Sequence, residues 1–237
     1  MALPKISAPT FSLELPSSGE SISYRPFLVK EEKILLIAQE GNDQTEIMNA
    51  IVQVLNNCCL DENVDIESLS MFDIEYFFLQ IRSRSIGEIV DLIMKCKVEE
   101  CEKKIPIQIN LLKEVEVIKN DKHTTKLQLT KDVGVVMRYQ TIKTSIEIKE
   151  PENEIENTFN VIINSIESVF DKKTVHFAKD IPREEMEDFL YGLPQTCFDK
   201  IKTFFETMPK LQYKKIYKCS EGHENEITVE GLTNFFG

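Results

Sequence analysis

The chain has 237 residues, 42% of them hydrophobic and 29% charged, and this ordinary balance excludes a wholly disordered protein. Its 40 acidic residues outnumber its 28 basic ones, and the formal net charge of −12 argues against nucleic acid as a partner, because phosphate binding needs clustered basic side chains. No membrane span of about 18 apolar residues is found, and residues 1–10 lack the basic start and apolar run of a secretory signal.

The N-terminal residues predict a β-hairpin. Apolar and polar residues alternate from Phe11 to Leu15, and Pro16–Gly19 is rich in turn-forming residues. Residues 22–24 would form the returning strand, which Arg25-Pro26 would end. An antiparallel hairpin is therefore expected between residues 11 and 24.

Three helices are predicted next, around residues 29–39, 43–55 and 70–81. In the second helix, Asp43-x-x-Glu46 forms a capping box, and the apolar residues that follow have the i, i+3, i+4, i+7 spacing of a helix with one buried face. The third helix carries apolar residues on nearly all sides. We expect it to be the most buried element of the N-terminal half, and a groove for a partner is the alternative.

From Gly87 the apolar period changes from helical to extended. Apolar and polar residues alternate over residues 105–111 and again over residues 142–148, which predicts two strands. Weaker strands are expected near residues 127–129 and 133–137. This part of the chain is therefore expected to form antiparallel strands.

A further helix is expected to begin in the acidic segment Glu150–Glu156, because acidic side chains suit the first turn of a helix. An apolar stripe from Ile155 to Phe170 continues it. Two more helices are predicted at residues 183–191 and 195–208. The chain then closes with two strands that flank a turn after Lys218.

Two turns carry the residues that are best suited to metal binding or catalysis. Cys96-x4-Cys101 lies between two predicted strands, and Cys219-Ser-Glu-Gly-His223 lies in a second strand–turn–strand unit, where Gly222 tolerates positive φ. If the turns faced each other, Cys96, Cys101, Cys219 and His223 would present the ligand set of a structural Zn²⁺ site. The alternatives are four reduced side chains in unrelated loops, or Cys219 and His223 as a nucleophile and its base.

These elements predict an α+β fold with an N-terminal β-hairpin, helices and antiparallel strands. The two strand–turn–strand units would join as a split zinc-ribbon-like site. We expect a hairpin and three-helix domain at residues 1–86 and an α+β domain with the Cys/His turns at residues 87–237. One single globular domain is the alternative, since the length is compatible with either.

Motifs of common enzymes are missing from the sequence. It has no G-x-x-x-x-G-K-[ST] loop, no G-x-G-x-x-G, no G-x-S-x-G and no H-E-x-x-H. Only eight glycines are available for phosphate-binding loops. The sequence therefore predicts no catalytic residue and no small-molecule substrate, with an uncharacterised hydrolase as the third alternative.

Three stretches of the sequence are similar to a known family. They are YRPFLVKEEK at residues 24–33, LSMFDIEYFFLQIR running on to SIGE at residues 69–88, and KCSEGH running on to GLTNFF at residues 218–236. In that order they resemble the baseplate hub assembly proteins of T-even-like bacteriophages. The resemblance covers residues 10–110 and 211–237.

The resemblance implies a non-catalytic protein of a contractile phage tail that binds other baseplate hub and tail proteins. It would act in the host cytoplasm during assembly, either as a chaperone that leaves or as a component that stays in the virion baseplate. The resemblance also favours the structural zinc. A zinc-ribbon regulator that binds nucleic acid is the alternative, which the acidic charge opposes. Leu232, Phe235 and Phe236 are candidate partner contacts, unless they fold back on their own domain.

Overall fold

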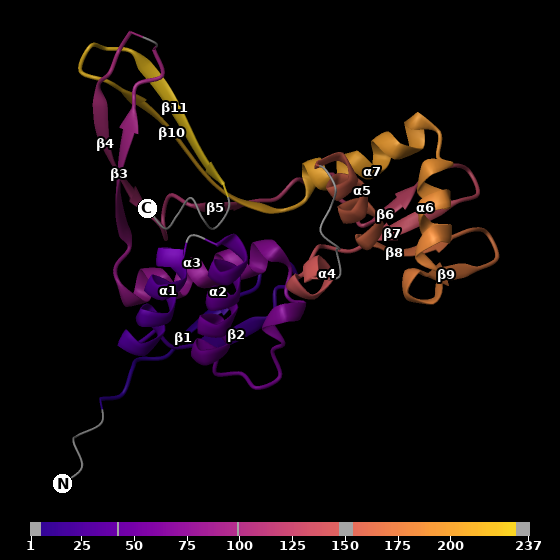
Figure 1. The fold of residues 1–237 in the computed structure, drawn as a ribbon, viewed down its shortest axis with the longest axis horizontal. Coiled ribbons are helices and arrows are strands. Elements are labelled where there is room, and N and C mark those ends of the chain that lie inside the picture. The colour runs from indigo at the N-terminus through magenta and orange to yellow at the C-terminus, as the bar shows by residue number, and fades with distance from the viewer. Residues whose placement is uncertain (1–5, 42, 99, 147–153, 231–237) are drawn as a thin grey trace. The chain divides into compact units, whose positions relative to one another are not determined.

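The computed structural model describes residues 6–41, 43–98, 100–146 and 154–230 (Figure 1). The chain divides into two compact units. Unit 1 comprises Met1–Ile66, Phe72–Ile118 and Lys210–Gly237. Unit 2 comprises Glu67–Met71 and Lys119–Pro209, so nearly all of it is an insertion in the sequence of unit 1. The domain boundary expected at residue 86 stays a prediction.

The N-terminal part of unit 1 contains the hairpin and the three helices expected from the sequence. The hairpin strands are β1 (Phe11–Glu14) and β2 (Ser21–Tyr24), and the helices are α1 (Val29–Gly41), α2 (Gln44–Cys58) and α3 (Met71–Ser85). Asp43 caps α2, because its side chain accepts hydrogen bonds from the backbone N–H groups of Thr45 and Glu46. A 3-10 turn, η1 (Ile66–Ser68), precedes α3.

A buried ion pair connects β2 with the two helices that follow it. Glu31 is fully buried and accepts hydrogen bonds from Arg25 at 3.1 Å and from the Leu28 N–H at 2.9 Å. Arg25 also donates to the carbonyl of Asn57 in α2 at 2.8 Å. Burial raises the pKa of the Glu31 carboxyl, but the hydrogen bonds from Arg25, Leu28 and Lys30 outweigh it and keep that pKa below its ordinary value.

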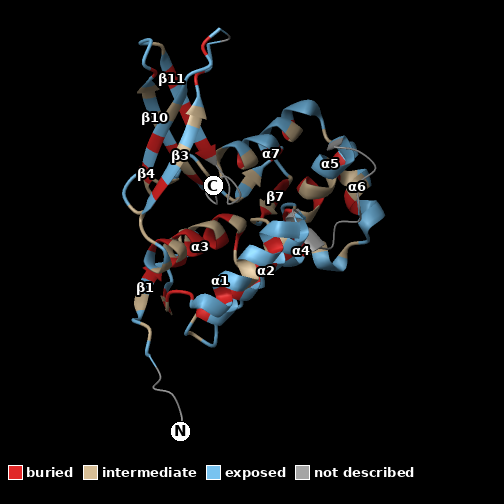
Figure 2. Ribbon diagram, turned by 60° about the vertical axis from the view of Figure 1, so that its left-hand side comes forward, coloured by how far each residue is buried: buried red, intermediate tan, exposed pale blue. Residues whose placement is uncertain are grey.

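Helix α3 is largely buried, and Figure 2 shows much of it in the colour of buried residues. Most of its apolar residues are buried, as the sequence predicts. Phe77 is fully buried, and its ring meets the edge of Tyr24 with the ring centroids 5.6 Å apart. The helix and the hairpin therefore share one core.

Truncating Phe77 should destabilise unit 1 strongly. We expect Phe77→Ala to lower the free energy of unfolding by about 3–5 kcal/mol, since the lost burial and the cavity both oppose folding. Ile86→Ala is a matched control, because Ile86 is 62% exposed, and its effect should stay within about 0.5 kcal/mol. Urea unfolding measures both variants. A loss below about 1 kcal/mol for Phe77→Ala would contradict the core assignment.

Two β-hairpins form the second part of unit 1 (Figure 1). The first consists of β3 (Ile89–Lys95) and β4 (Lys104–Asn110), which pair antiparallel. The second consists of β10 (Lys210–Lys218) and β11 (Glu224–Glu230), and β5 (Glu116–Ile118) extends it to a sheet with the order β11-β10-β5. Each strand alternates buried and exposed residues, so the hairpins bury one face each.

Unit 2 consists of helices and an antiparallel sheet. The sheet order is β6-β7-β8-β9, with β6 (Lys126–Gln128), β7 (Gly134–Met137), β8 (Ile166–Phe170) and β9 (Val175–Phe177). Its helices are α4 (Ile142–Ile146), α5 (Glu154–Asn164), α6 (Arg183–Tyr191) and α7 (Gln195–Thr207), and a 3-10 turn, η2 (Ala178–Asp180), precedes α6. The core between sheet and helices includes Val135, Ile166, Ile201, Phe204 and the thiol of Cys197.

The strand expected over residues 142–148 is wrong, because Ile142–Ile146 forms helix α4 and residues 147–148 lie outside the described residues. Two threonines start this helix. The Thr144 N–H donates to the Thr141 hydroxyl at 3.2 Å, and the Thr141 N–H donates to the Thr144 hydroxyl at 2.9 Å. This reciprocal cap satisfies N–H groups that a helix leaves free, and it outweighs the local preference for a strand.

The helix expected to continue to Phe170 is also partly wrong, because α5 ends at Asn164 and Ile166–Phe170 forms strand β8. Ser165 marks the change. Its hydroxyl donates back to the Val161 carbonyl at 2.8 Å, while its own carbonyl accepts from the Arg138 N–H at 2.8 Å in the adjoining strand region. Pairing with β7 therefore decides the conformation after Ser165.

Within the described residues, no helix is both long and apolar enough to cross a membrane.

Candidate metal centre

The turns of the two hairpins bring four potential metal ligands together. Cys96 and Cys101 come from the turn between β3 and β4, and Cys219 and His223 come from the turn between β10 and β11. Their ligand atoms all lie within 4.8 Å of one another. The structure thus joins residues that are separated by 118 positions in the sequence.

The distances suit one tetrahedral ion. Cys96 Sγ lies 3.8 Å from His223 Nδ1, and Cys101 Sγ lies 4.0 Å from Cys219 Sγ. Three sulfurs at about 2.3 Å and one nitrogen at about 2.0 Å from a tetrahedral metal would stand about 3.5–3.8 Å apart. The site therefore needs only small side-chain movements to hold an ion.

Backbone hydrogen bonds shape both turns. In the first turn, the Cys96 N–H donates to the Lys103 carbonyl at 3.0 Å, which closes the end of the hairpin. In the second turn, the Cys219 N–H donates to the His223 carbonyl at 3.1 Å. Gly222 has a φ of 84°, a conformation that favours glycine, so its position in the ligand turn has a clear local reason.

The thiols are shielded from water. Cys96 is 8% exposed, Cys101 is 9% exposed and Cys219 is 5% exposed, with Ile105 packed against them. His223 is half-buried. Four protein ligands in a closed arrangement are typical of a structural metal site, because no position stays open for water or a substrate.

The thiols do not ionise equally. The N–H of Val98, with further donors from Asn225 and His223, lowers the pKa of Cys96 to about 6 in spite of burial. The Lys103 N–H lowers the pKa of Cys101, but burial and the neighbouring Cys96 and Cys219 raise it overall above its ordinary value. Ionisation of Cys101 beside the Cys96 thiolate is therefore disfavoured, and a bound cation would remove this repulsion.

Sequence reasoning missed Asn225, which contacts the site from strand β11. Asn225 is 4% exposed, and its side chain reaches both ligand turns by hydrogen bonds to Cys96, Lys97 and His223. One signal could have revealed it. Asn225 occupies the inward position of an alternating strand, where the pattern of Ile227 and Val229 predicts an apolar residue.

The other cysteines and histidines have separate surroundings. Cys58 and Cys59 lie at the end of α2, and Cys197 is buried in the core of unit 2, where its thiol packs as a small apolar side chain. His123 also lies in unit 2, where its two ring nitrogens contact the hydroxyls of Thr207 and Tyr139 at 2.9 Å each. None of these residues belongs to the cluster found among the described residues.

The candidate partner contacts Leu232, Phe235 and Phe236 lie outside the described residues. Their role stays a prediction.

Comparison with known families gives one match. The model of a family described as T4 bacteriophage base plate protein matches residues 8–237, which include both ligand turns and both units. Comparison with curated proteins and with solved structures gives no match. The match confirms the resemblance to phage baseplate proteins over nearly the whole chain. The chain therefore belongs to the T4 bacteriophage base plate protein family.

Proposed function

We propose that this protein is a non-catalytic factor or component in the assembly of the baseplate hub of a contractile phage tail. The observation that carries the proposal is the family match over residues 8–237. The stretches at residues 24–33, 69–88 and 218–236 add a resemblance to hub assembly proteins in particular. The protein would bind other hub and tail proteins in the host cytoplasm and then either stay in the virion baseplate or leave.

Protein–protein contact fits the chemistry of the chain better than catalysis does. The best-formed cluster of reactive side chains is the Cys/His group, and its four ligands would all be used by one metal ion. This arrangement supports a structural role for Cys219 and His223 and weighs against their use as a nucleophile and a base. A hydrolase is therefore the weaker candidate.

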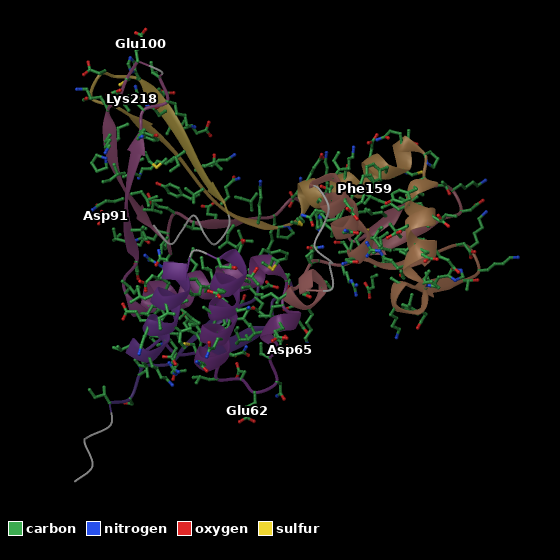
Figure 3. All side chains as sticks on the ribbon, viewed as in Figure 1. Glu62, Asp65, Asp91, Glu100, Phe159 and Lys218 are labelled. Atoms are coloured by element: carbon green, nitrogen blue, oxygen red, sulfur yellow. The ribbon has the colours of Figure 1, made fainter. Side chains whose placement is uncertain are left out.

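Nucleic-acid binding through the hairpin turns is also the weaker candidate. Two lysines near the ligands are paired with acids, since Lys103 contacts Glu221 at 3.4 Å and Lys218 contacts Glu224 at 3.8 Å. Glu100 adds another acid at the same end of the hairpins (Figure 3). These pairs and the net charge of −12 of the chain both oppose the binding of phosphate groups.

We further propose that the metal centre holds one structural Zn²⁺, with Cys96, Cys101, Cys219 and His223 as ligands. Three thiolates and one imidazole are a donor set that zinc prefers, and calcium and magnesium prefer oxygen instead. The burial of the thiols and the distances between the ligand atoms support a tetrahedral ion. The ion would fasten the two hairpins of unit 1 to each other.

Phage that lack this protein should fail to build complete baseplates. We expect electron microscopy of infected cells to show tails without hubs or no assembled baseplates, because assembly proceeds through ordered protein contacts. Expression of the intact gene from a plasmid should restore assembly, which provides the control. The protein content of purified virions then distinguishes a component from a chaperone. Normal baseplates in the absence of the protein would overturn the proposal.

A further inference from the structure

We infer that Asn225 is the positioning residue of the metal centre, and that it joins the two ligand turns and orients the Cys96 thiolate for the ion. The inference rests on the proposed metal site. It assigns to a residue that is not a ligand the task of building that site from two distant parts of the chain.

The side chain of Asn225 connects both turns. Its Nδ2 group donates to Cys96 Sγ at 3.5 Å and to the His223 carbonyl at 3.0 Å, and its Oδ1 atom accepts from the Lys97 N–H at 2.8 Å. Cys96 and Lys97 belong to the turn after β3, whereas His223 belongs to the turn after β10. Lys97 and Cys96 precede Asn225 by 128 and 129 positions in the sequence. One side chain therefore holds together two segments that are more than 120 positions apart.

These neighbours require an amide. The Lys97 N–H can only donate, and the His223 carbonyl can only accept, so the carbonyl and the NH₂ group of Asn225 each have one correct place. The NH₂ group then faces Cys96 and stabilises its negative charge. An aspartate would place a second acceptor against the sulfur, and an alanine would leave the Lys97 N–H without its acceptor.

The hydrogen bonds of Asn225 to the two turns are shielded from water. The ion pair of Lys103 and Glu221 also spans them, but each of these side chains is 55% exposed. Exposed pairs of this kind contribute little, because water screens them. Asn225 is 4% exposed, so its hydrogen bonds form where competition from water is weak.

Groups that hydrogen-bond to metal ligands tune metal affinity, and their loss typically weakens binding about 10–100-fold. We expect Asn225→Asp to lower the Zn²⁺ affinity of the full-length protein by about this factor while one ion per chain still binds at saturation. Asn225→Ala, which removes the donor without adding charge, should also weaken binding. Competition with a chromophoric chelator measures the affinity.

The absorption spectrum of the Co²⁺-bound protein provides a measurement that a purely structural role of Asn225 would leave unchanged. When Co²⁺ replaces Zn²⁺, the thiolate-to-cobalt charge-transfer bands report on the donor strength of the sulfurs. We expect both Asn225 variants to shift these bands. Thr228→Asp is the matched control, since Thr228 is exposed on the same strand and the substitution adds the same charge. It should leave affinity and spectrum unchanged.

The outcomes separate the two proposals. Asn225→Asp and Asn225→Ala proteins that bind Zn²⁺ within about threefold of wild type, below the 10–100-fold range, with an unaltered Co²⁺ spectrum would overturn the role of Asn225. A wild-type protein that binds no ion would overturn the zinc site itself, and the inference with it. If the Asn225→Asp protein does not fold in the presence of Zn²⁺, the Asn225→Ala protein still tests the role of Asn225. Thermal unfolding of its Zn²⁺-bound form shows whether this variant is folded.

Discussion

Replacing one ligand, as in Cys219→Ser, is expected to remove the zinc and to unfold the paired hairpins of unit 1. Metal binding by a site that the unfolded chain lacks contributes its free energy directly to folding, and small zinc domains gain about 10–16 kcal/mol in this way. The hairpins here also bury apolar residues such as Leu211 and Ile227, so part of their stability is independent of the ion. We still expect a loss above the roughly 3–5 kcal/mol of a large core truncation.

The measurement combines elemental analysis with unfolding. Wild-type protein purified without chelators should contain one zinc per chain, and a strong chelator should lower its unfolding midpoint. Cys197→Ala provides the matched control, because Cys197 is equally buried but lies in the core of unit 2. It should keep its zinc. Well under one zinc in the wild type, or a full zinc content in Cys219→Ser, would contradict the assigned ligands.

Much of the fold could be predicted from the sequence, because the signals are local. Asp43 starts α2 through its own side chain, and turn residues close the hairpin between β1 and β2. The helices α6 and α7 also lie where the sequence predicts them. In each case the residues that determine the element lie within a few positions of it.

Pairing with distant residues explains the error at β8 and the short strands that the sequence does not predict. The apolar residues of β8 continue the stripe of a helix, but pairing with β7 makes them a strand. The strands β5 and β9 are three residues long, and periodicity does not reveal elements of that length. Short strands depend on their neighbours in the sheet rather than on their own sequence.

The four candidate metal ligands could be predicted for a different reason. Thiols and an imidazole in two strand–turn–strand units have few uses that explain all four residues, so their types indicated a common site before its geometry was known. Asn225 offered no such chemical signal, because an asparagine is compatible with many surroundings. Its role depends on the Lys97 N–H and the Cys96 sulfur, which only the folded chain brings close to it.

The wide separation of the ligands in sequence also has a structural explanation. Ile118 and Lys210 are directly opposite each other in the antiparallel pairing of β5 with β10. The chain thus leaves unit 1 and returns to it at neighbouring positions, and residues 119–209 are inserted between them. The 118 positions between Cys101 and Cys219 therefore consist mainly of the insertion.

This geometry leads to the second large effect that we expect. Deleting residues 119–209 and joining Ile118 to Lys210 through Asn-Gly should leave a folded unit 1 with its metal centre. A two-residue type I′ turn matches the twist of two antiparallel strands whose ends are paired, as these are. The segment at residues 67–71 would lose backbone contacts such as the hydrogen bond from the Met71 N–H to Gln140, so a loss of about 1–3 kcal/mol is expected.

The shortened chain should therefore bind one zinc and unfold cooperatively, and Cys219→Ser in the same background should abolish zinc binding and destabilise the paired hairpins. Zinc analysis and urea unfolding monitored by circular dichroism measure both effects. The result also decides between two divisions of the chain. If residues 87–237 folded as one domain, removing residues 119–209 would delete most of its core, including Val135, Ile166 and Phe204. The shortened protein would then bind no metal and show no cooperative transition beyond that of residues 1–86, which would refute the insertion.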